Sequence, residues 1–329
     1  MFYSLVVTLL VLVTGTARSA QEQMVNAAKK EGHLVLYTAM QPEDSTKVIE
    51  LYRGRYPFVD ATFFRAGSAP LLNRILTETR GNQFLFDVVS GKVSHLVLLR
   101  KKGLLGKISS AELQSYPERF KDAGSRWVDL YNNYYTIAYN TDRVKPADLP
   151  VKWEDLLDRK WADGKITLDP RSYDWYFGMR GLLGPKKTRD FMGKLNGNKP
   201  AFRDGNVLIA NLLAAGEFPL AVTYAHLVER LRMRGAPVDW VVVKPMIAVP
   251  ISAALPSRSP HPNAAALFID LILSKDVAEL LKTMGRVPTR ADVTPSAKRL
   301  DPQSLDLVPL HVSSDEMDPA EFRMLFGLQ

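Results

Sequence analysis

The stretch DLYNNYYTIAYNT, residues 129–141, separates two regions of the chain in which strand and helix patterns alternate. Its apolar and aromatic side chains are dense enough for an extended and largely buried strand. Asn132-Asn133 is expected to interrupt that strand, because asparagine tolerates turn geometries. The pattern fits two α/β lobes joined by a crossing strand, and it fits a single large α/β domain with an ordinary core strand here. Periodicity alone favours neither.

The alternation on either side of this stretch predicts parallel sheets covered by helices. Before it, each of three strands is followed by a helix with an apolar face. After it, shorter strands alternate with helices, and a strand at 245–251 leads back toward the first region. The expected strands are 33–38, 59–65, 84–90, 165–168, 219–223 and 238–243.

Length and charge limit the classes of protein to which this chain can belong. A chain of 329 residues with 46% hydrophobic and 24% charged residues is typical of a globular protein with room for two domains. The net charge of +8 is compatible with anionic partners. The basic clusters are short, lack interleaved aromatic residues and show no helix-turn-helix or zinc-finger spacing. We therefore expect no nucleic-acid partner.

The first residues differ from the rest of the chain. An apolar run from Leu5 to Val13 is followed by Ala17-Arg18-Ser19, which places small residues where a signal peptidase cleaves. No Lys or Arg precedes the run, so a retained anchor stays open beside the favoured interpretation, a cleaved signal peptide at 1–19. The chain contains no cysteine, which excludes disulfides and thiolate chemistry.

Several short motifs, in their order along the chain, resemble the extracellular solute-binding proteins of ABC importers. The likeness is to the branch that contains ferric-ion, sugar-phosphate, thiamine and phosphonate receptors. The motifs are Ala27-Ala28-Lys29-Lys30-Glu31-Gly32 before Val35-Leu36-Tyr37-Thr38, Arg65-Ala66-Gly67-Ser68 before Leu72-Asn73-Arg74-Ile75, Phe86-Asp87-Val88-Val89, Tyr139-Asn140-Thr141, and Ser274-Lys275-Asp276-Val277-Ala278 leading to Gly285-Arg286-Val287-Pro288-Thr289-Arg290.

The resemblance implies an α/β protein with the two-lobe, type II fold of periplasmic binding proteins. Each lobe would be a mixed sheet flanked by helices, with two crossover strands as the hinge. It implies lobe 1 at 20–133 plus 248–329 and lobe 2 at 134–247. It also implies a monomeric, non-enzymatic periplasmic protein that traps a small anion as the lobes close and delivers it to an inner-membrane ABC permease.

Candidate ligand residues follow from a general rule for open α/β sheets, in which ligands bind beyond the carboxyl ends of strands, near helix N-termini. Hydroxyls, backbone N–H groups and arginines there suit an anion. The same side chains also serve as helix caps, surface ion pairs and core aromatics. The candidates are Tyr37, Thr38, Arg65, Gly67, Ser68 and Ser90 in the first lobe, and Arg171, Ser172, Tyr173, Thr223 and Tyr224 in the second.

Ferric iron is the first alternative ligand. The ferric branch of the resembled family typically uses a His after the first strand and an adjacent Tyr pair in the second lobe. Here the first loop has no His, and Tyr224 stands alone before His226; the adjacent pair Tyr134-Tyr135 lies in the crossover. We therefore expect no metal ligands and no resident cofactor, and if iron binds we expect Tyr37, Tyr224 and His226 to hold it.

Two other functions stay open. The chain has no nucleophile elbow, P-loop or dinucleotide glycine fingerprint, which argues against an enzyme on the same fold. A ligand-sensing module that docks on a receptor is the other alternative. The sequence names neither the solute nor the permease.

Overall fold

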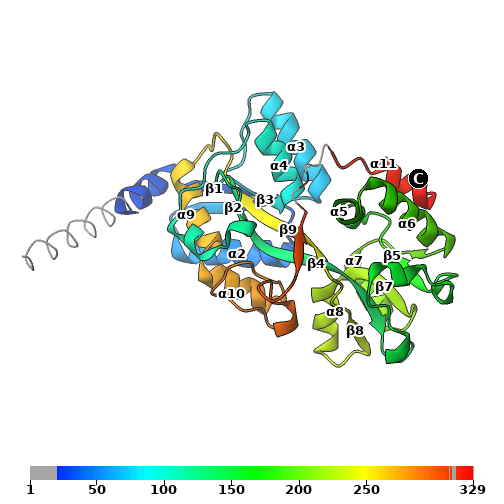
Figure 1. Cartoon of the computed structure of the whole chain (residues 1–329). Coiled ribbons are helices and arrows are strands. Elements are labelled where there is room, and N and C mark those ends of the chain that lie inside the picture. Colours follow the sequence, from blue (N-terminus) through cyan, green and yellow to red (C-terminus); the bar gives the residue numbers. More distant parts are fainter. Residues whose placement is uncertain (1–20, 311, 313–315, 329) are drawn as a thin grey trace, which may run out of the picture. The chain divides into compact units, whose positions relative to one another are not determined.

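The computed structural model describes residues 21–310, 312 and 316–328, so the expected signal peptide at 1–19 lies outside the described residues. The chain forms two compact units. Unit 1 holds the described residues up to Gly91, together with Leu99–Val128 and Ala253–Val277. Unit 2 holds Lys92–Leu98, Asp129–Ser252 and the described residues from Ala278 onward. Figure 1 shows the elements of both units.

Unit 1 is built on a parallel sheet of order β2-β1-β3, as the strand–helix alternation predicts. In β1, Leu34, Leu36 and Tyr37 are buried, and Asp87 at the entrance to β3 accepts a hydrogen bond from the Val35 N–H (2.8 Å). The strands are β1 (His33–Thr38), β2 (Asp60–Arg65) and β3 (Val88–Lys92); the helices are α2 (Pro42–Arg55), α3 (Ser68–Arg80), α4 (Val93–Lys101, which continues from unit 2) and α9 (Pro262–Ile272).

Unit 2 contains a mixed sheet in which β4 is antiparallel to β7 and β8, while β5 is parallel to β7 and β6. The strands are β4 (Trp127–Asn140, entering from unit 1), β5 (Ile166–Leu168), β6 (Ala201–Phe202), β7 (Leu220–Tyr224), β8 (Val238–Trp240), β9 (Met246–Ala254, leading into unit 1) and β10 (Leu307–Pro309). The helices are α5 (Tyr173–Leu183), α6 (Pro185–Gly197), α7 (Asn206–Ala214), α8 (Ala225–Arg232), α10 (Lys275–Thr283, which begins in unit 1) and α11 (Ala320–Phe326). The α/β fold class is thus confirmed.

Strand β4 corrects one expectation. Asn132-Asn133 does not interrupt it, and both residues are buried within a continuous strand. The Asn132 N–H donates to the Val287 carbonyl (3.0 Å), and the Asn133 amide donates to the Val249 carbonyl (3.4 Å). These long-range bonds hold an extended backbone where local preference favours a turn.

The segment after residue 277 groups with unit 2, whereas the sequence placed it in lobe 1. Besides the bond from Asn132 to Val287, β10 pairs with β9 in parallel, and Phe322 and Phe326 of α11 are buried in the main core of unit 2. The predicted lobe limits stay a prediction.

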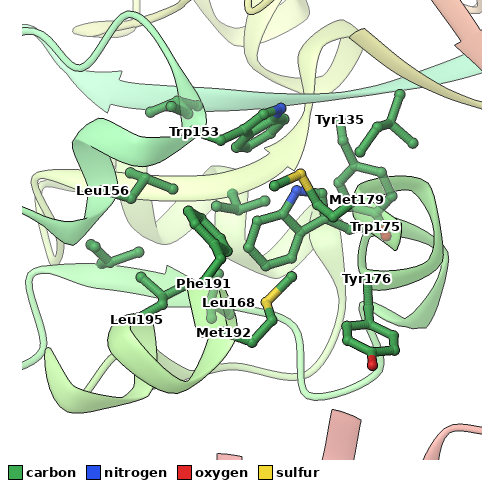
Figure 2. Packing of buried hydrophobic residues seen from close by; sticks show 14 of the residues in the cluster. Tyr135, Trp153, Leu156, Leu168, Trp175, Tyr176, Met179, Phe191, Met192 and Leu195 are labelled. Carbon is green, nitrogen blue, oxygen red and sulfur yellow. The ribbon is translucent and has the colours of Figure 1, made fainter. Parts of the chain in front are cut away.

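An aromatic-rich core positions helix α5 within unit 2. Trp175 is fully buried and packs on Trp153 and Phe191, with ring centroids 5.4 and 6.2 Å away (Figure 2). Three residues further along the helix, Gly178 faces Ile247 so closely that an added Cβ would lie 2.8 Å from the Ile247 Cδ1 atom. The position of α5 is therefore fixed by close packing.

Among residues 21–310, 312 and 316–328, no helix is both long and apolar enough to cross a bilayer.

Candidate functional site

Tyr37, the aromatic candidate of unit 1, is part of the packed interior. It is 2% exposed and stacks on Phe86 at 4.9 Å between ring centroids. Its hydroxyl donates to Glu78 Oε1 (3.0 Å) and accepts from Arg74 Nε (3.1 Å). Burial, followed by the Glu78 carboxylate, raises the pKa of Tyr37. Its hydroxyl is thus engaged within unit 1, and its phenolate form is disfavoured.

The other unit 1 candidates lie at the carboxyl ends of the strands. Thr38 is fully buried and accepts the Met40 N–H at 3.0 Å. Arg65 donates to the Met40 carbonyl at 3.3 Å. Gly67 is the N-cap of α3, and Ser68 is its first residue. The buried Ser90 hydroxyl has no hydrogen-bond partner within the described residues.

In unit 2, Ser172 occupies the N-cap of α5 without making the side-chain bond that a cap residue ordinarily makes. Its hydroxyl is fully buried and, among residues 21–310, 312 and 316–328, has no hydrogen bond of good geometry. The loop before it is rigid, since Asp169 accepts the N–H groups of Arg171 (2.8 Å) and Gly205 (3.1 Å). Burial raises the pKa of Asp169. The start of α5 therefore presents a fixed, unsatisfied hydroxyl beside backbone N–H groups.

Two tyrosines face each other across neighbouring strands next to this helix end. Tyr135 of β4 and Tyr224 of β7 are partners in the strand register, with ring centroids 4.7 Å apart and their hydroxyls hydrogen-bonded. The Ser172 hydroxyl lies beside the Tyr135 phenol. Burial is the main cause that raises the pKa of both phenols. Both are therefore neutral hydroxyls at ordinary pH.

A buried ion pair completes this cluster. The Lys92 ammonium donates to Asp174, the second residue of α5, and their side chains are 29% and 5% exposed. Burial opposes the charge on Lys92, but the Asp174 carboxylate outweighs it and keeps the pKa of Lys92 above its ordinary value. Burial and the nearby Lys92 charge lower the pKa of His95 to about 4. Lys92, Tyr135, Ser172, Asp174 and Tyr224 are hereafter called the phenol–lysine cluster.

The remaining unit 2 candidates lie around this cluster with other partners. The exposed Arg171 pairs with Asp204, which is the surface ion pair that the sequence allowed. Thr223 donates its hydroxyl to the Asn206 side chain at 3.1 Å. Tyr173 packs edge-on against Phe322, with centroids 5.6 Å apart.

His226 is 5% exposed and lies beside Tyr224. Its Nε2 atom lies 3.3 Å from Arg286 Nη1, and its ring stacks on Tyr224 at 5.9 Å. Burial and the charges of Arg286 and Arg230 lower its pKa well below the ordinary value. In the part of the chain that the structure describes, no group of three or more His, Cys, Asp or Glu side chains is arranged for a metal ion.

Sequence reasoning missed three members of the phenol–lysine cluster. Tyr135 appeared only as half of an adjacent pair, although it lies in the stretch that organises the chain. Lys92 directly follows the loop that supplied Ser90, and Asp174 directly follows Tyr173. Extending each post-strand loop by two residues would have found Lys92 and Asp174. The facing of Tyr135 and Tyr224 depends on strand register, which a sequence does not give.

Comparison with known proteins gives a consistent result. The model of a family described as bacterial extracellular solute-binding protein matches residues 86–309. The chain is 25% identical over 262 residues to iron uptake protein A2 of Synechocystis, covering 70% of this chain and 74% of that protein.

Two solved structures are similar in fold. Iron-bound HitA from Pseudomonas aeruginosa superposes with a TM-score of 0.77 at 18% identity, covering 89% of this chain and 97% of that one. The periplasmic binding protein AfuA from Actinobacillus pleuropneumoniae, with fructose-6-phosphate bound, gives 0.73 at 24% identity and covers 90% and 97%. Both likenesses support the type II periplasmic-binding-protein fold.

Proposed function

Because this chain belongs to the family of bacterial extracellular solute-binding proteins, we propose that it captures a small solute carrying a phosphate or carboxylate group. The phenol–lysine cluster of unit 2 binds the anionic group. The protein is exported to the periplasm, where it delivers the solute to an ABC permease of the inner membrane. It acts by binding and release, without catalytic turnover.

The observation that carries this proposal is the protonated phenol pair beside a lysine at a helix N-terminus. Burial raises the pKa of Tyr135 and Tyr224, so both stay protonated. Tyr135 uses its proton in the hydrogen bond to Tyr224, and the Tyr224 hydroxyl is left to donate to an anion. Hydrogen bonds from neutral hydroxyls to a charged acceptor are stronger than those between neutral groups. Lys92 adds the positive charge.

The start of α5 supplies further donors. The first N–H groups of a helix lack intrahelical partners, and the helix dipole favours negative charge there. Ser172 places its buried, unsatisfied hydroxyl at the same point. A bound anion would satisfy that hydroxyl, which otherwise costs free energy.

Asp174 pairs with Lys92 and still leaves the Lys92 ammonium accessible to an entering anion. An isolated ammonium in a largely buried place is costly, so Lys92 needs the Asp174 carboxylate as counter-ion. An entering anion shares Lys92 with Asp174. Because Lys92 and Tyr224 are partly exposed, a solute has access to the cluster.

Thermal unfolding tests the proposal. Inorganic phosphate, sugar phosphates, phosphonates, thiamine, small carboxylates and ferric citrate are added singly to the mature protein. A ligand specific to the folded state at 100 times its dissociation constant stabilises it by about 2.7 kcal/mol. We expect an upward shift of the melting temperature with at least one phosphate or carboxylate compound, and the shift is smaller in Tyr224→Phe and Tyr135→Phe.

The matched control is Tyr139→Phe. Tyr139 lies on β4 in the same alternation as Tyr135 and packs on the same core, but it is outside the cluster. It should keep the ligand-induced shift. Absence of a shift with every compound in the wild-type protein contradicts the proposal.

Ferric iron is the second candidate, and it is favoured by the same two phenols together with the Asp174 carboxylate. These are hard oxygen ligands of the kind that ferric iron prefers, and two similar proteins carry iron in their names. Iron binding would require both phenols to lose protons that burial holds in place. A phenolate–iron complex absorbs visible light, so adding ferric citrate distinguishes the candidates: we expect no visible band, and a band that disappears in Tyr224→Phe establishes the iron alternative.

A further inference from the structure

Helix α11, near the C-terminus, packs within unit 2 on helix α5, which begins at the phenol–lysine cluster. The contact joins distant parts of the chain, since 145 residues separate Tyr176 of α5 from Glu321 of α11. Figure 1 shows α11 in red beside α5 and α6. In α11, Phe322 and Phe326 are buried and Met324 is 72% exposed. The helix therefore packs an apolar face on unit 2 and presents another face to solvent.

The face of α5 that contacts α11 carries Tyr173, Tyr176 and Arg180. Spacings of three and four residues place these side chains on one side of the helix. The Phe322 ring packs edge-on against both tyrosines, with its centroid 5.6 Å from that of Tyr173 and 5.8 Å from that of Tyr176. One phenylalanine of α11 thus contacts the first turn of α5 at two points.

Glu321 adds polar contacts to the same face of α5. The buried Tyr176 hydroxyl donates to Glu321 Oε2, and a hydrogen bond to a carboxylate is stronger than one between neutral groups. Burial, followed by the Glu321 carboxylate, raises the pKa of Tyr176, so the phenol keeps its proton. Arg180 and Arg189 also donate to Glu321, but their side chains are 36% and 53% exposed, and exposed ion pairs contribute little. The bond from Tyr176 is therefore the principal polar contact.

These contacts bear on the solute site because they involve the immediate neighbours of its residues. Tyr173, on which α11 packs, lies between Ser172 and Asp174, two members of the phenol–lysine cluster. The Tyr176 N–H donates to the Ser172 carbonyl at 3.1 Å. A shift of either tyrosine would therefore move the Ser172 hydroxyl and the Asp174 carboxylate. Binding sites keep their geometry only when supporting side chains hold the residues that contact the ligand.

We propose that Glu321 and Phe322 of α11 are positioning residues of the solute site, which hold the first turn of α5 in the geometry that binds the anion. This inference rests on the proposed function and adds to it a segment outside the phenol–lysine cluster. Both residues act through Tyr173 and Tyr176 and not by direct contact with the solute.

Two measurements on the mature, untagged chain test this. Hydrogen exchange of the peptide that contains residues 172–180 is measured without solute, because exchange reports local opening. Calorimetric titration with inorganic phosphate measures affinity. We expect Glu321→Ala and Phe322→Leu to increase the exchange of this peptide. Each should also weaken phosphate binding by about three- to tenfold, the factor that corresponds to one lost hydrogen bond or contact.

Glu321→Gln is the conservative variant. Its amide oxygen still accepts a hydrogen bond from the Tyr176 hydroxyl, so exchange and phosphate affinity should both stay close to those of the wild type. A Glu321→Gln variant as impaired as Glu321→Ala would contradict a role through Tyr176.

Phe326→Leu is the matched control on the same helix. The Phe326 ring packs on Phe202 of β6 and on Phe322, with centroids 5.6 and 4.9 Å away. This variant should lose stability in urea unfolding much as Phe322→Leu does, but it should keep the phosphate affinity and the exchange of residues 172–180. Equal effects of the two phenylalanine variants on affinity and exchange would overturn the proposal, as would unchanged exchange in both Glu321→Ala and Phe322→Leu.

The two measurements separate this proposal from the proposed function. A wild-type chain that binds no phosphate counts against the proposed function alone. Hydrogen exchange without solute then still decides whether α11 holds the first turn of α5.

Discussion

The two units carry comparable sets of candidate residues at the ends of their strands, but they use them differently. In unit 1 the Tyr37 hydroxyl is engaged by Glu78 and Arg74, and the Thr38 hydroxyl by Met40. In unit 2 the Tyr135 and Tyr224 hydroxyls are engaged with each other, the Ser172 hydroxyl is unsatisfied, and a lysine lies beside them. A place at the end of a strand therefore does not decide a binding role, because such residues can be engaged within their own unit, as Tyr37 and Thr38 are, or lack a partner among the described residues, as Ser90 and Ser172 do.

The largest expected effect concerns the ion pair of unit 2. Lys92→Met leaves the Asp174 carboxylate buried without its partner, and breaking a buried pair from one side costs about 3–5 kcal/mol. Urea unfolding should show this loss. The double variant Lys92→Met, Asp174→Leu should recover most of it, because no uncompensated charge remains. Equal stability of the single variant and the wild type would mean that the pair is solvated, and unit 2 would lose its distinguishing charge.

The second largest effect is expected for substitutions that test whether close packing fixes the position of α5, the helix that begins at the phenol–lysine cluster. Gly178→Ala places a Cβ against Ile247 and should destabilise the protein by about 1–3 kcal/mol. Gly181→Ala is the matched control on the same helix, because nothing lies within 4 Å of its added Cβ. It should stabilise by up to about 1 kcal/mol, the helix preference of alanine over glycine. If urea unfolding showed that both substitutions change stability in the same direction, the close packing of Gly178 against Ile247 would be contradicted.

A paired substitution compares the tyrosines of the two units directly. Tyr37→Phe removes a hydroxyl engaged by Glu78 and Arg74, and should cost about 1–2 kcal/mol of stability while leaving solute affinity unchanged. Tyr224→Phe should lower solute affinity with a smaller loss of stability. Thermal unfolding with and without solute measures both quantities. If Tyr37→Phe lowered solute affinity and Tyr224→Phe caused the larger loss of stability, the comparison between the two units would be contradicted.

The smallest effect is a pH dependence that arises in unit 2. The pKa of His95 is lowered to about 4 in the folded state, against about 6.5 when unfolded. Between these values the unfolded state binds the additional proton, so stability falls as the pH is lowered, by up to about 1.4 kcal/mol per pH unit. His95→Gln should flatten this part of the profile in urea unfolding at pH 4 to 7. An unchanged slope in the variant would show that His95 is not buried in its neutral form.

Local sequence patterns predicted much of the fold. β1 spans the expected residues 33–38, and β2 and β7 differ from expectation by one residue. These elements follow from apolar runs bounded by glycine, proline and polar residues. The continuous strand at Asn132-Asn133 did not follow, because bonds to Val287 and Val249, far along the chain, stabilise it.

The candidate sites were less predictable. The sequence identified Ser172 and Tyr224 through their place after strands. It did not identify Lys92, Tyr135 and Asp174, the side chains that form the phenol–lysine cluster with them. Those residues are brought together by register and helix packing. A pattern within one segment of the chain does not show which distant residues lie close together in the fold.

The most direct test of the central claim is the identity of the molecule that the protein retains when it is purified from its producing cells without unfolding. Mass and metal analysis of the released ligand measures it. The account predicts a small phosphate- or carboxylate-bearing molecule, without stoichiometric iron, that is lost in Tyr224→Phe. One ferric ion per chain, with no such molecule beside it, would contradict the account.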